Sequence, residues 1–142
     1  MEIKIKYHNK NLEKIKKIKQ GDWIDLRAAE TVSLEIGDFR IISLGISVKL
    51  PKGCEAHIVP RSSTFKNYGV IQANSMGVVD ESYCGEDDVW GFPALAMRKT
   101  TIAENDRICQ FRVVKKMEEM TINEVEKMEN KNRGGFGSTG KR

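Results

Sequence analysis

The sequence predicts an all-β domain, built as a sandwich or a barrel. Short runs of alternating apolar residues recur along most of the 142 positions, and glycine, proline or aspartate separates them at short intervals. No long stretch has the apolar spacing of a helix. The length suits one compact domain with its own hydrophobic core.

The predicted strands follow one another from the N-terminus. Residues 2–7 alternate charge with isoleucine and are expected to form an edge strand, whereas 12–18 has apolar residues at every third position and permits a short helix or an irregular turn. A turn at Gly37-Asp38 separates the runs on either side of it. The remaining strand-like runs are 23–29, 31–36, 39–44, 46–50, 54–59, 70–73, 89–97, 101–102 and 108–114.

Composition narrows the classes of protein. No apolar run approaches the roughly 18 residues that a membrane span requires, and the N-terminus lacks the apolar region of a secretion signal, so we expect a cytoplasmic protein without membrane contact. Cys54, Cys84 and Cys109 are odd in number and have no paired spacing, which predicts free thiols. The net charge of +4 suits a small phosphorylated ligand. The lysine-rich run 10–19 lacks the interleaved aromatics typical of nucleic-acid binding.

Polar groups stand out in three places along the body of the chain. In 77–86, Asp80 follows an apolar run and precedes Tyr83, with glycines at both ends, which is typical of either a structural hairpin or a pocket wall. Arg61 and Ser62 are suited to phosphate, although a salt bridge and a helix cap would use the same residues. Gln110 places an amide where an apolar residue is expected, unless it faces solvent.

The C-terminal tail, 133–142, is rich in glycine and is not expected to be ordered alone. Its glycines surround Phe136, and Arg133, Ser138 and Thr139 add a cation and two hydroxyls. This pattern indicates a phosphate-binding arm with an aromatic ring that stacks on a base, or else a solubility tail. Residues 118–132 are charged and could contribute one last strand. The two histidines have no metal-ligand spacing.

Taken in order, five segments resemble the trimeric dUTPase family, which hydrolyses dUTP to dUMP and pyrophosphate. They span nearly the whole chain, and 25–30 and 74–83 look closest to versions from Gram-positive bacteria and their phages. The segments are 25–28, 60–63, 77–86, 106–110 and 133–140.

The resemblance implies a distorted β jelly roll, a three-fold homotrimer and active sites shared between subunits. It implies one domain over 1–130 and a flexible arm over 131–142 that closes on the site. The activity would keep uracil out of DNA and supply dUMP for thymidylate synthesis. No nucleic-acid partner is implied.

The resemblance also assigns roles to residues. Asp80 is the general base that activates water for attack on the α-phosphorus. Tyr83 packs under the deoxyribose and rejects ribose. The hairpin that reads uracil includes Asn74, Gly77 and Val79. Phosphates are held by Arg61, Ser62 and Gln110, and Asp25 reaches Mg²⁺ through water, with the inner ligands coming from the substrate.

In the arm, Arg133, Ser138 and Thr139 match residues that close on the γ-phosphate, with Gly137 among them and Phe136 over uracil. Only two residues separate Arg133 from Phe136, two fewer than in many relatives, so Arg133 must reach the phosphates along a shorter path. Cys84 stands where a basic residue is common.

Two alternatives remain open. The dCTP deaminases share the trimeric architecture, but they use a glutamate at the place that Asp80 occupies here. Phage-borne members of the fold can also bind regulatory proteins, and a surface for such a partner is not visible in one sequence.

Overall fold

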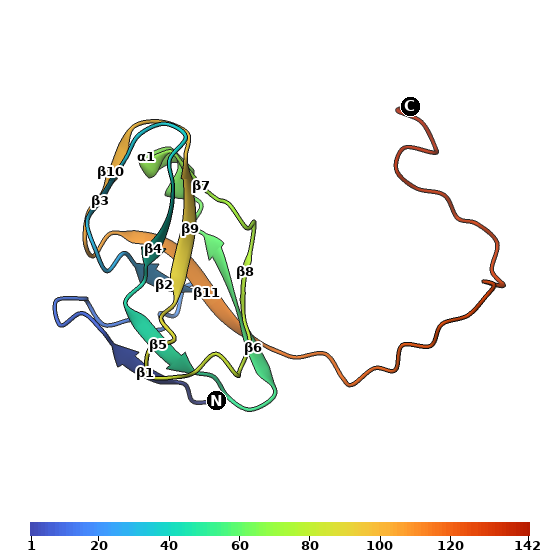
Figure 1. Cartoon of the computed structure of the whole chain (residues 1–142), viewed down its shortest axis with the longest axis horizontal. Helices are drawn as coiled ribbons and strands as arrows, with labels where there is room; N and C mark the ends of the chain where they lie inside the picture. The colour runs from blue at the N-terminus through green and yellow to red at the C-terminus, as the bar shows by residue number, and fades with distance from the viewer.

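A computed structural model describes residues 1–142 (Figure 1). The strands are β1 (Lys4–Tyr7), β2 (Ile24–Arg27), β3 (Val32–Leu34), β4 (Phe39–Ser43), β5 (Ile46–Lys49), β6 (Cys54–Pro60), β7 (Val70–Gln72), β8 (Gly77–Val79), β9 (Gly91–Ala96), β10 (Thr100–Ile102) and β11 (Arg107–Lys115). One five-residue helix, α1 (Thr64–Tyr68), lies between β6 and β7. The prediction of an all-β chain is confirmed, and no helix is long enough to span a membrane.

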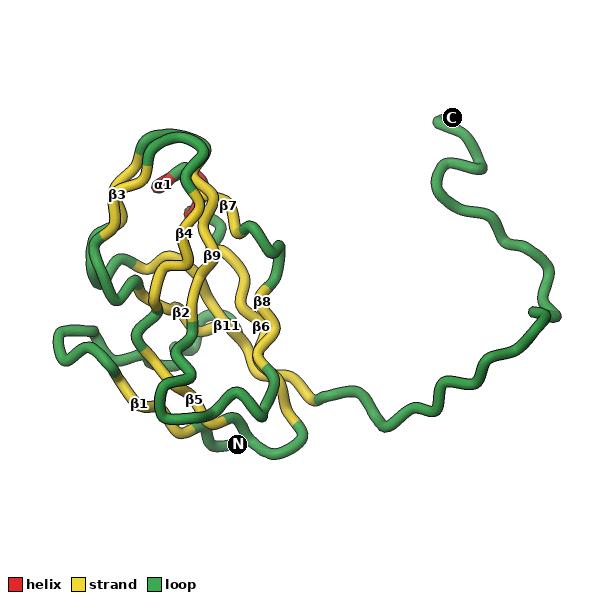
Figure 2. The backbone as a smooth tube through the Cα atoms, in the orientation of Figure 1, coloured by secondary structure: helices red, strands yellow, loops and turns green.

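The strands form small antiparallel sheets joined by short loops (Figure 2). The largest has the order β2-β11-β6-β8, and a second has the order β4-β9-β7. Two-stranded sheets pair β1 with β5 and β10 with β3. The long strands β6 and β11 run side by side over seven paired positions, from Cys109 with Pro60 to Lys115 with Cys54. Of the candidate site residues, Gln110 lies on β11 and Arg61 directly follows β6.

Apolar side chains from these sheets meet in one core. The alternating burial of β9 reflects its period of two, with Phe92, Ala94 and Ala96 facing inward. Trp90 and Phe111 pack edge to face, with ring centroids 5.2 Å apart and an interplanar angle of 88°. The core therefore joins β9 and the segment before it to β11.

Three local features bear on the sequence analysis. Residues 12–18 take the irregular turn, one of the two alternatives, and the backbone there hydrogen-bonds to side chains: Ile15 N–H donates to the Tyr7 hydroxyl at 2.9 Å. The helix α1 was missed because five residues are too few to show a helical period. The predicted turn at Gly37-Asp38 is confirmed, with the Asp38 N–H donating to the Glu35 carbonyl at 3.0 Å. The strands on either side of it pair elsewhere, β3 with β10 and β4 with β9.

The chain leaves the body after β11. No strand forms within 118–132, where Met120, Ile122 and Val125 are too few to make a continuous apolar face. Every residue from Lys116 to the C-terminus is exposed, and Figure 1 shows the segment 116–142, which ends in the tail, extending away from the sheets.

Candidate active site

The turn that follows β8 presents the Asp80 carboxylate to solvent. Its Oδ2 accepts hydrogen bonds from the Ser82 hydroxyl at 2.6 Å and from the Ser82 backbone N–H at 2.8 Å. The Asp80 carbonyl accepts a bond from the Tyr83 N–H at 3.0 Å, which closes the turn. The bonds from Ser82, followed by the charge of Lys116, lower the pKa of Asp80 below its usual value. The carboxylate is therefore ionised at neutral pH and can accept a proton.

A groove of about 500 Å³ lies beside this turn. Asn74, Asp80 and Tyr83 contribute polar groups to its lining, and Ile41 and Pro93 are among its apolar residues. A groove with apolar walls and a few polar groups suits a flat ligand that has a polar edge. The structure thus brings together the five residues that the sequence placed at the hairpin, namely Asn74, Gly77, Val79, Asp80 and Tyr83.

Close packing against β6 and one hydrogen bond hold the wall of this groove. A Cβ added to Gly77 would lie 3.2 Å from the Cβ of Ile58, so a larger residue would require β6 and β8 to shift by a few tenths of an ångström. The Tyr83 hydroxyl donates to the Val89 carbonyl at 3.1 Å, which fixes the orientation of its ring. Contacts within the chain therefore hold this wall of the groove in place.

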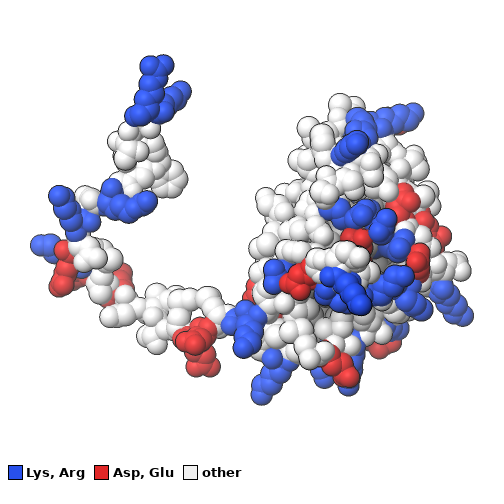
Figure 3. Space-filling model, turned by 180° about the vertical axis from the view of Figure 1, so that it is seen from behind, with Lys and Arg blue, Asp and Glu red and all other residues white.

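A second cluster surrounds the Asp25 carboxylate, which lies between two guanidinium groups. Arg61 Nε lies 3.0 Å from Asp25 Oδ1, and Arg107 Nη1 lies 3.3 Å from Oδ2. Two cations against one carboxylate leave a net positive charge, which attracts phosphate oxygens. Lys and Arg also predominate over Asp and Glu on the face of the body seen in Figure 3.

A buried threonine fixes the backbone of Arg61. The Arg61 N–H donates to Thr64 Oγ1 at 2.8 Å, and the Thr64 hydroxyl donates to the Ile108 carbonyl at 2.8 Å. Thr64 is 1% exposed, so water cannot replace either bond. These bonds tie the turn between β6 and α1 to β11.

Gln110 and Ser62 lie in the same region. Gln110 Nε2 donates to the Pro60 carbonyl at 3.1 Å, and an amide nitrogen carries a second N–H that remains available. Ser62 is exposed next to Arg61, and its hydroxyl has no intramolecular hydrogen bond. Both side chains can still donate to an incoming anion.

The residues of the tail do not reach either cluster of their own chain. Phe136 is fully exposed, and the hydrogen bonds around it are local: Ser138 N–H donates to the Gly135 carbonyl at 3.0 Å and Gly140 N–H to the Gly137 carbonyl at 2.9 Å. Arg133 and Thr139 are exposed in the same segment, and Figure 1 shows this segment extending away from the sheets.

On one chain, the candidate residues therefore occupy three separate places. Val79 pairs with Ala56 near the start of β6, and Asp80 comes next, whereas Arg61 follows the end of β6. Positions 56 and 61 are five residues apart, which corresponds to about 16 Å at about 3.3 Å per residue. One chain therefore holds these three groups of residues apart from one another.

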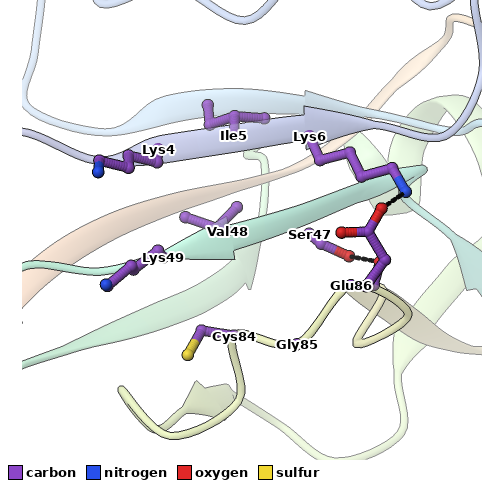
Figure 4. A pocket seen from close by; sticks show the side chains of 9 residues that line it. All are labelled: Lys4, Ile5, Lys6, Ser47, Val48, Lys49, Cys84, Gly85 and Glu86. Carbon is purple, nitrogen blue, oxygen red and sulfur yellow. Dashed lines mark hydrogen bonds and ion pairs between the residues drawn. The ribbon is translucent and has the colours of Figure 1, made fainter.

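Cys84 lies outside the groove, in a separate hollow of about 210 Å³ (Figure 4). Its thiol is exposed, and Lys4 and Lys49, which are directly opposite each other on β1 and β5, line the same hollow. Lys6 forms an ion pair with Glu86 at the end of this segment. The lysines supply positive charge around position 84.

Comparison with known proteins identifies the family. The dUTPase family model matches residues 4–140, almost the entire chain. The chain belongs to the dUTPase family. The SPbeta prophage-derived deoxyuridine 5′-triphosphate nucleotidohydrolase of Bacillus subtilis (strain 168) is 57% identical over 140 residues, which cover 99% of each chain. A deoxyuridine 5′-triphosphate nucleotidohydrolase of Neorickettsia sennetsu is 38% identical over 94% of this chain and 91% of its own.

Solved dUTPase structures share the fold at lower sequence identity. A mutant dUTPase of phage 80alpha has a TM-score of 0.81 and 21% identity over 96% of this chain and 98% of its own. A mutant dUTPase of phage phi11 of Staphylococcus aureus has a TM-score of 0.78 and 18% identity over 92% and 100%. The expected jelly-roll fold and the expected likeness to phage members of the dUTPase family are confirmed.

Sequence reasoning missed three residues that contact the candidate site residues. Arg107 shares the Asp25 carboxylate with Arg61. It lies in the segment 106–110, and its place in the turn that enters β11 was the signal that could have found it. Glu81 and Lys116 form an ion pair beside Asp80. Position 116 lies 35 residues after position 81, and no local pattern could have revealed this pair.

Proposed function

We propose that the protein hydrolyses dUTP to dUMP and pyrophosphate. The observation that carries this proposal is the ionised carboxylate of Asp80 at the edge of a groove that Asn74 and Tyr83 also line. Membership of the dUTPase family supports it, as do relatives that are named for this reaction.

In the proposed reaction, Asp80 acts as general base. Its carboxylate accepts a proton from a water molecule, whose oxygen forms a bond to the α-phosphorus. The bond from this phosphorus to the bridging oxygen of the β-phosphate breaks, and pyrophosphate leaves with the electron pair. Both hydrogen bonds from Ser82 go to Oδ2, so Oδ1 remains available to accept the proton of the water.

The groove would recognise the nucleoside. Asn74 and the backbone of Gly77 and Val79 provide donors and acceptors for the edge of uracil, and a wrong base would leave such groups unpaired. Tyr83, whose hydroxyl is already bonded to Val89, offers its ring to the sugar and would exclude a ribose 2′-hydroxyl by steric contact.

The basic cluster and the tail would hold the triphosphate. Arg61, Ser62 and Gln110 have donors available at the end of β6. Arg133, Ser138 and Thr139 would close on the γ-phosphate, with Gly137 giving the backbone freedom to turn and Phe136 covering uracil. Closure would exclude bulk water from the site.

Mg²⁺ fits these residues as an ion carried largely by the substrate. The chain has no group of three Asp, Glu, His or Cys residues arranged to hold a metal. Asp25, already paired with Arg61 and Arg107, would hold the ion through water rather than directly. When bound, Mg²⁺ would neutralise phosphate charge. A structural Mg(II) ion is described for the dUTPase of phage phi11.

We also propose that the protein is a homotrimer with active sites shared between subunits. The separation of the candidate residues on one chain supports this, because a neighbouring chain could bring the missing groups to each groove. Apolar side chains on the surface of the sheets offer area for such contacts: Phe39, Ile41, Ile71, Met76 and Val78 are all more than 40% exposed. Residues 131–142 would then be the closing arm, and 116–130 would span to the neighbouring subunit.

A nucleotide panel tests the proposal. Purified protein with Mg²⁺ is incubated with dUTP, dCTP, dTTP and UTP, and the products are separated by HPLC. We expect dUMP and pyrophosphate from dUTP and little turnover of the other three. Formation of dUTP from dCTP would instead identify a deaminase, and absence of any product would refute the proposed activity.

A further inference from the structure

Three residues from distant parts of the chain meet beside Asp80. Gly53 lies in the turn before β6, Glu81 directly follows Asp80, and Lys116 is the first residue after β11. Lys116 Nζ lies 2.8 Å from Glu81 Oε1, and the Gly53 N–H donates to Glu81 Oε2 at 2.9 Å. The Lys116 N–H donates to the Gly53 carbonyl at 2.9 Å, which completes a ring of hydrogen bonds.

This ring connects two segments that the proposed reaction uses. Glu81 belongs to the turn that carries Asp80, and Lys116 is the residue at which the C-terminal tail leaves the body. Both side chains are partly shielded, with 30% of Glu81 and 37% of Lys116 exposed. An ion pair with both carboxylate oxygens bonded has one defined geometry, unlike most surface pairs.

The ammonium group of Lys116 also lies near the carboxylate of Asp80. Its Nζ is 3.7 Å from Asp80 Oδ1, the oxygen that Ser82 does not bond. Glu81 is the other charged group in the same turn. On the adjacent strand β6, Glu55 and His57 are paired with each other at 2.5 Å. Lys116 is therefore the cation that faces Asp80.

We infer that Glu81 and Lys116 are positioning residues, which hold an ammonium group beside Asp80 Oδ1 and set the direction in which the tail leaves the body. The inference rests on the proposed dUTP hydrolysis. Ser82 bonds only Oδ2, so without the ammonium group Oδ1 would present its lone pair to the attacking water for less of the time. A tail with a loose start would close on the substrate less often.

The test is steady-state dUTP hydrolysis by Lys116→Ala, Glu81→Gln and the double variant. Each single variant is expected to lower kcat roughly tenfold with little change in KM, because orientation affects the transition state more than substrate binding. The double variant should lose no more than the worse single variant, since either change already breaks the pair. Lys116→Arg should recover most of the rate. The acid limb of kcat/KM should move to higher pH in Lys116→Ala, an effect that lost folding would not produce.

Lys115→Ala is the matched control, because Lys115 is the exposed neighbour of Lys116 and has no ion pair. Thermal unfolding of each variant, measured in parallel, shows that the proteins compared are folded. Equal kcat in Lys115→Ala and Lys116→Ala, or additive losses in the double variant, would overturn the inference while wild-type turnover of dUTP stands. A wild type that does not hydrolyse dUTP would overturn the proposed function itself and this inference with it.

Discussion

The charge state of Asp80 depends on a residue two positions further along the chain. Ser82 donates both its hydroxyl and its backbone N–H to the same oxygen, and these bonds stabilise the ionised form. The sequence placed Asp80 and Tyr83 in one turn, because glycines and an apolar run surround them. The sequence could not show which carboxylate oxygen of Asp80 Ser82 would bond, or that Lys116 would lie near the other oxygen. Both contacts depend on how the chain folds.

Ser82→Ala should make the enzyme less active at low pH. The substitution removes the side-chain bond, which is the largest cause that lowers the pKa of Asp80, so this pKa should rise. A base works only when ionised, and the acid limb of kcat/KM should therefore move to higher pH, with little change on the alkaline side. A pH profile measured with dUTP checks this. An unchanged acid limb would show that another group controls it.

Asp80→Asn should abolish turnover while nucleotide binding remains. An amide cannot accept the proton of the attacking water, and loss of a general base costs on the order of 10²- to 10⁴-fold in rate. The measurement is kcat for dUTP together with calorimetric binding of a non-hydrolysable analogue. Rates near those of the wild type in the variant would assign the base to a different residue.

At the scale of elements, β6 separates two of the groups of candidate residues, since Asp80 lies near its start and Arg61 follows its end. The alternating runs were enough to predict nearly all of the strands, because period-two burial is a local property. Strand partners were not predictable in the same way: β3 pairs with β10 across more than sixty positions, and only packing selects that pairing. The helix α1 likewise depends on tertiary contacts, since Ser63 precedes it without making a side-chain cap.

Thr64→Val should destabilise the protein. The valine keeps the shape, but the partly buried Arg61 N–H and the buried Ile108 carbonyl each lose a partner, and the free energy of unfolding should fall by about 2 kcal/mol. Urea denaturation at a fixed protein concentration measures it. Thr101→Val is the matched control, because Thr101 is exposed and bonds only to Ser33; its effect should stay within about 0.5 kcal/mol. Equal effects of the two substitutions would contradict the role given to Thr64.

Removal of residues 133–142 should leave a folded body with severely reduced catalysis. The tail makes no contact that the sheets need, but its closure would complete the phosphate site, and a loss of about 100-fold in kcat/KM is expected. A chain that lacks only 140–142 keeps Arg133 to Thr139 and should resemble the full-length protein. If both truncations hydrolyse dUTP equally well, the tail has no part in catalysis.

At the scale of the whole molecule, the three separate groups of candidate residues are the central feature. Their order along the chain pointed to the dUTPase family, but no periodicity in the sequence could show that Asp80 and Arg61 lie at opposite ends of β6. The trimer was expected only from the family resemblance. The distance between the groups now gives a physical reason for it, because one chain holds the groups apart from one another.

Mixed trimers should recover activity that neither parent has. Asp80→Asn supplies intact tails, and the chain truncated after Asn132 supplies intact Asp80 carboxylates. If tails close on neighbouring subunits, exchange of subunits between the two proteins should restore measurable dUTP hydrolysis. Sedimentation should show one trimeric species. Mixing without any recovered turnover would indicate that each tail acts on its own chain.

The most direct test of the proposed reaction is hydrolysis of dUTP in water enriched in ¹⁸O, with mass spectrometry of both products. Attack of water on the α-phosphorus places one labelled oxygen in dUMP and none in pyrophosphate, and we expect this result with the wild-type protein and Mg²⁺. Label in the pyrophosphate, or no hydrolysis of dUTP, would contradict the account.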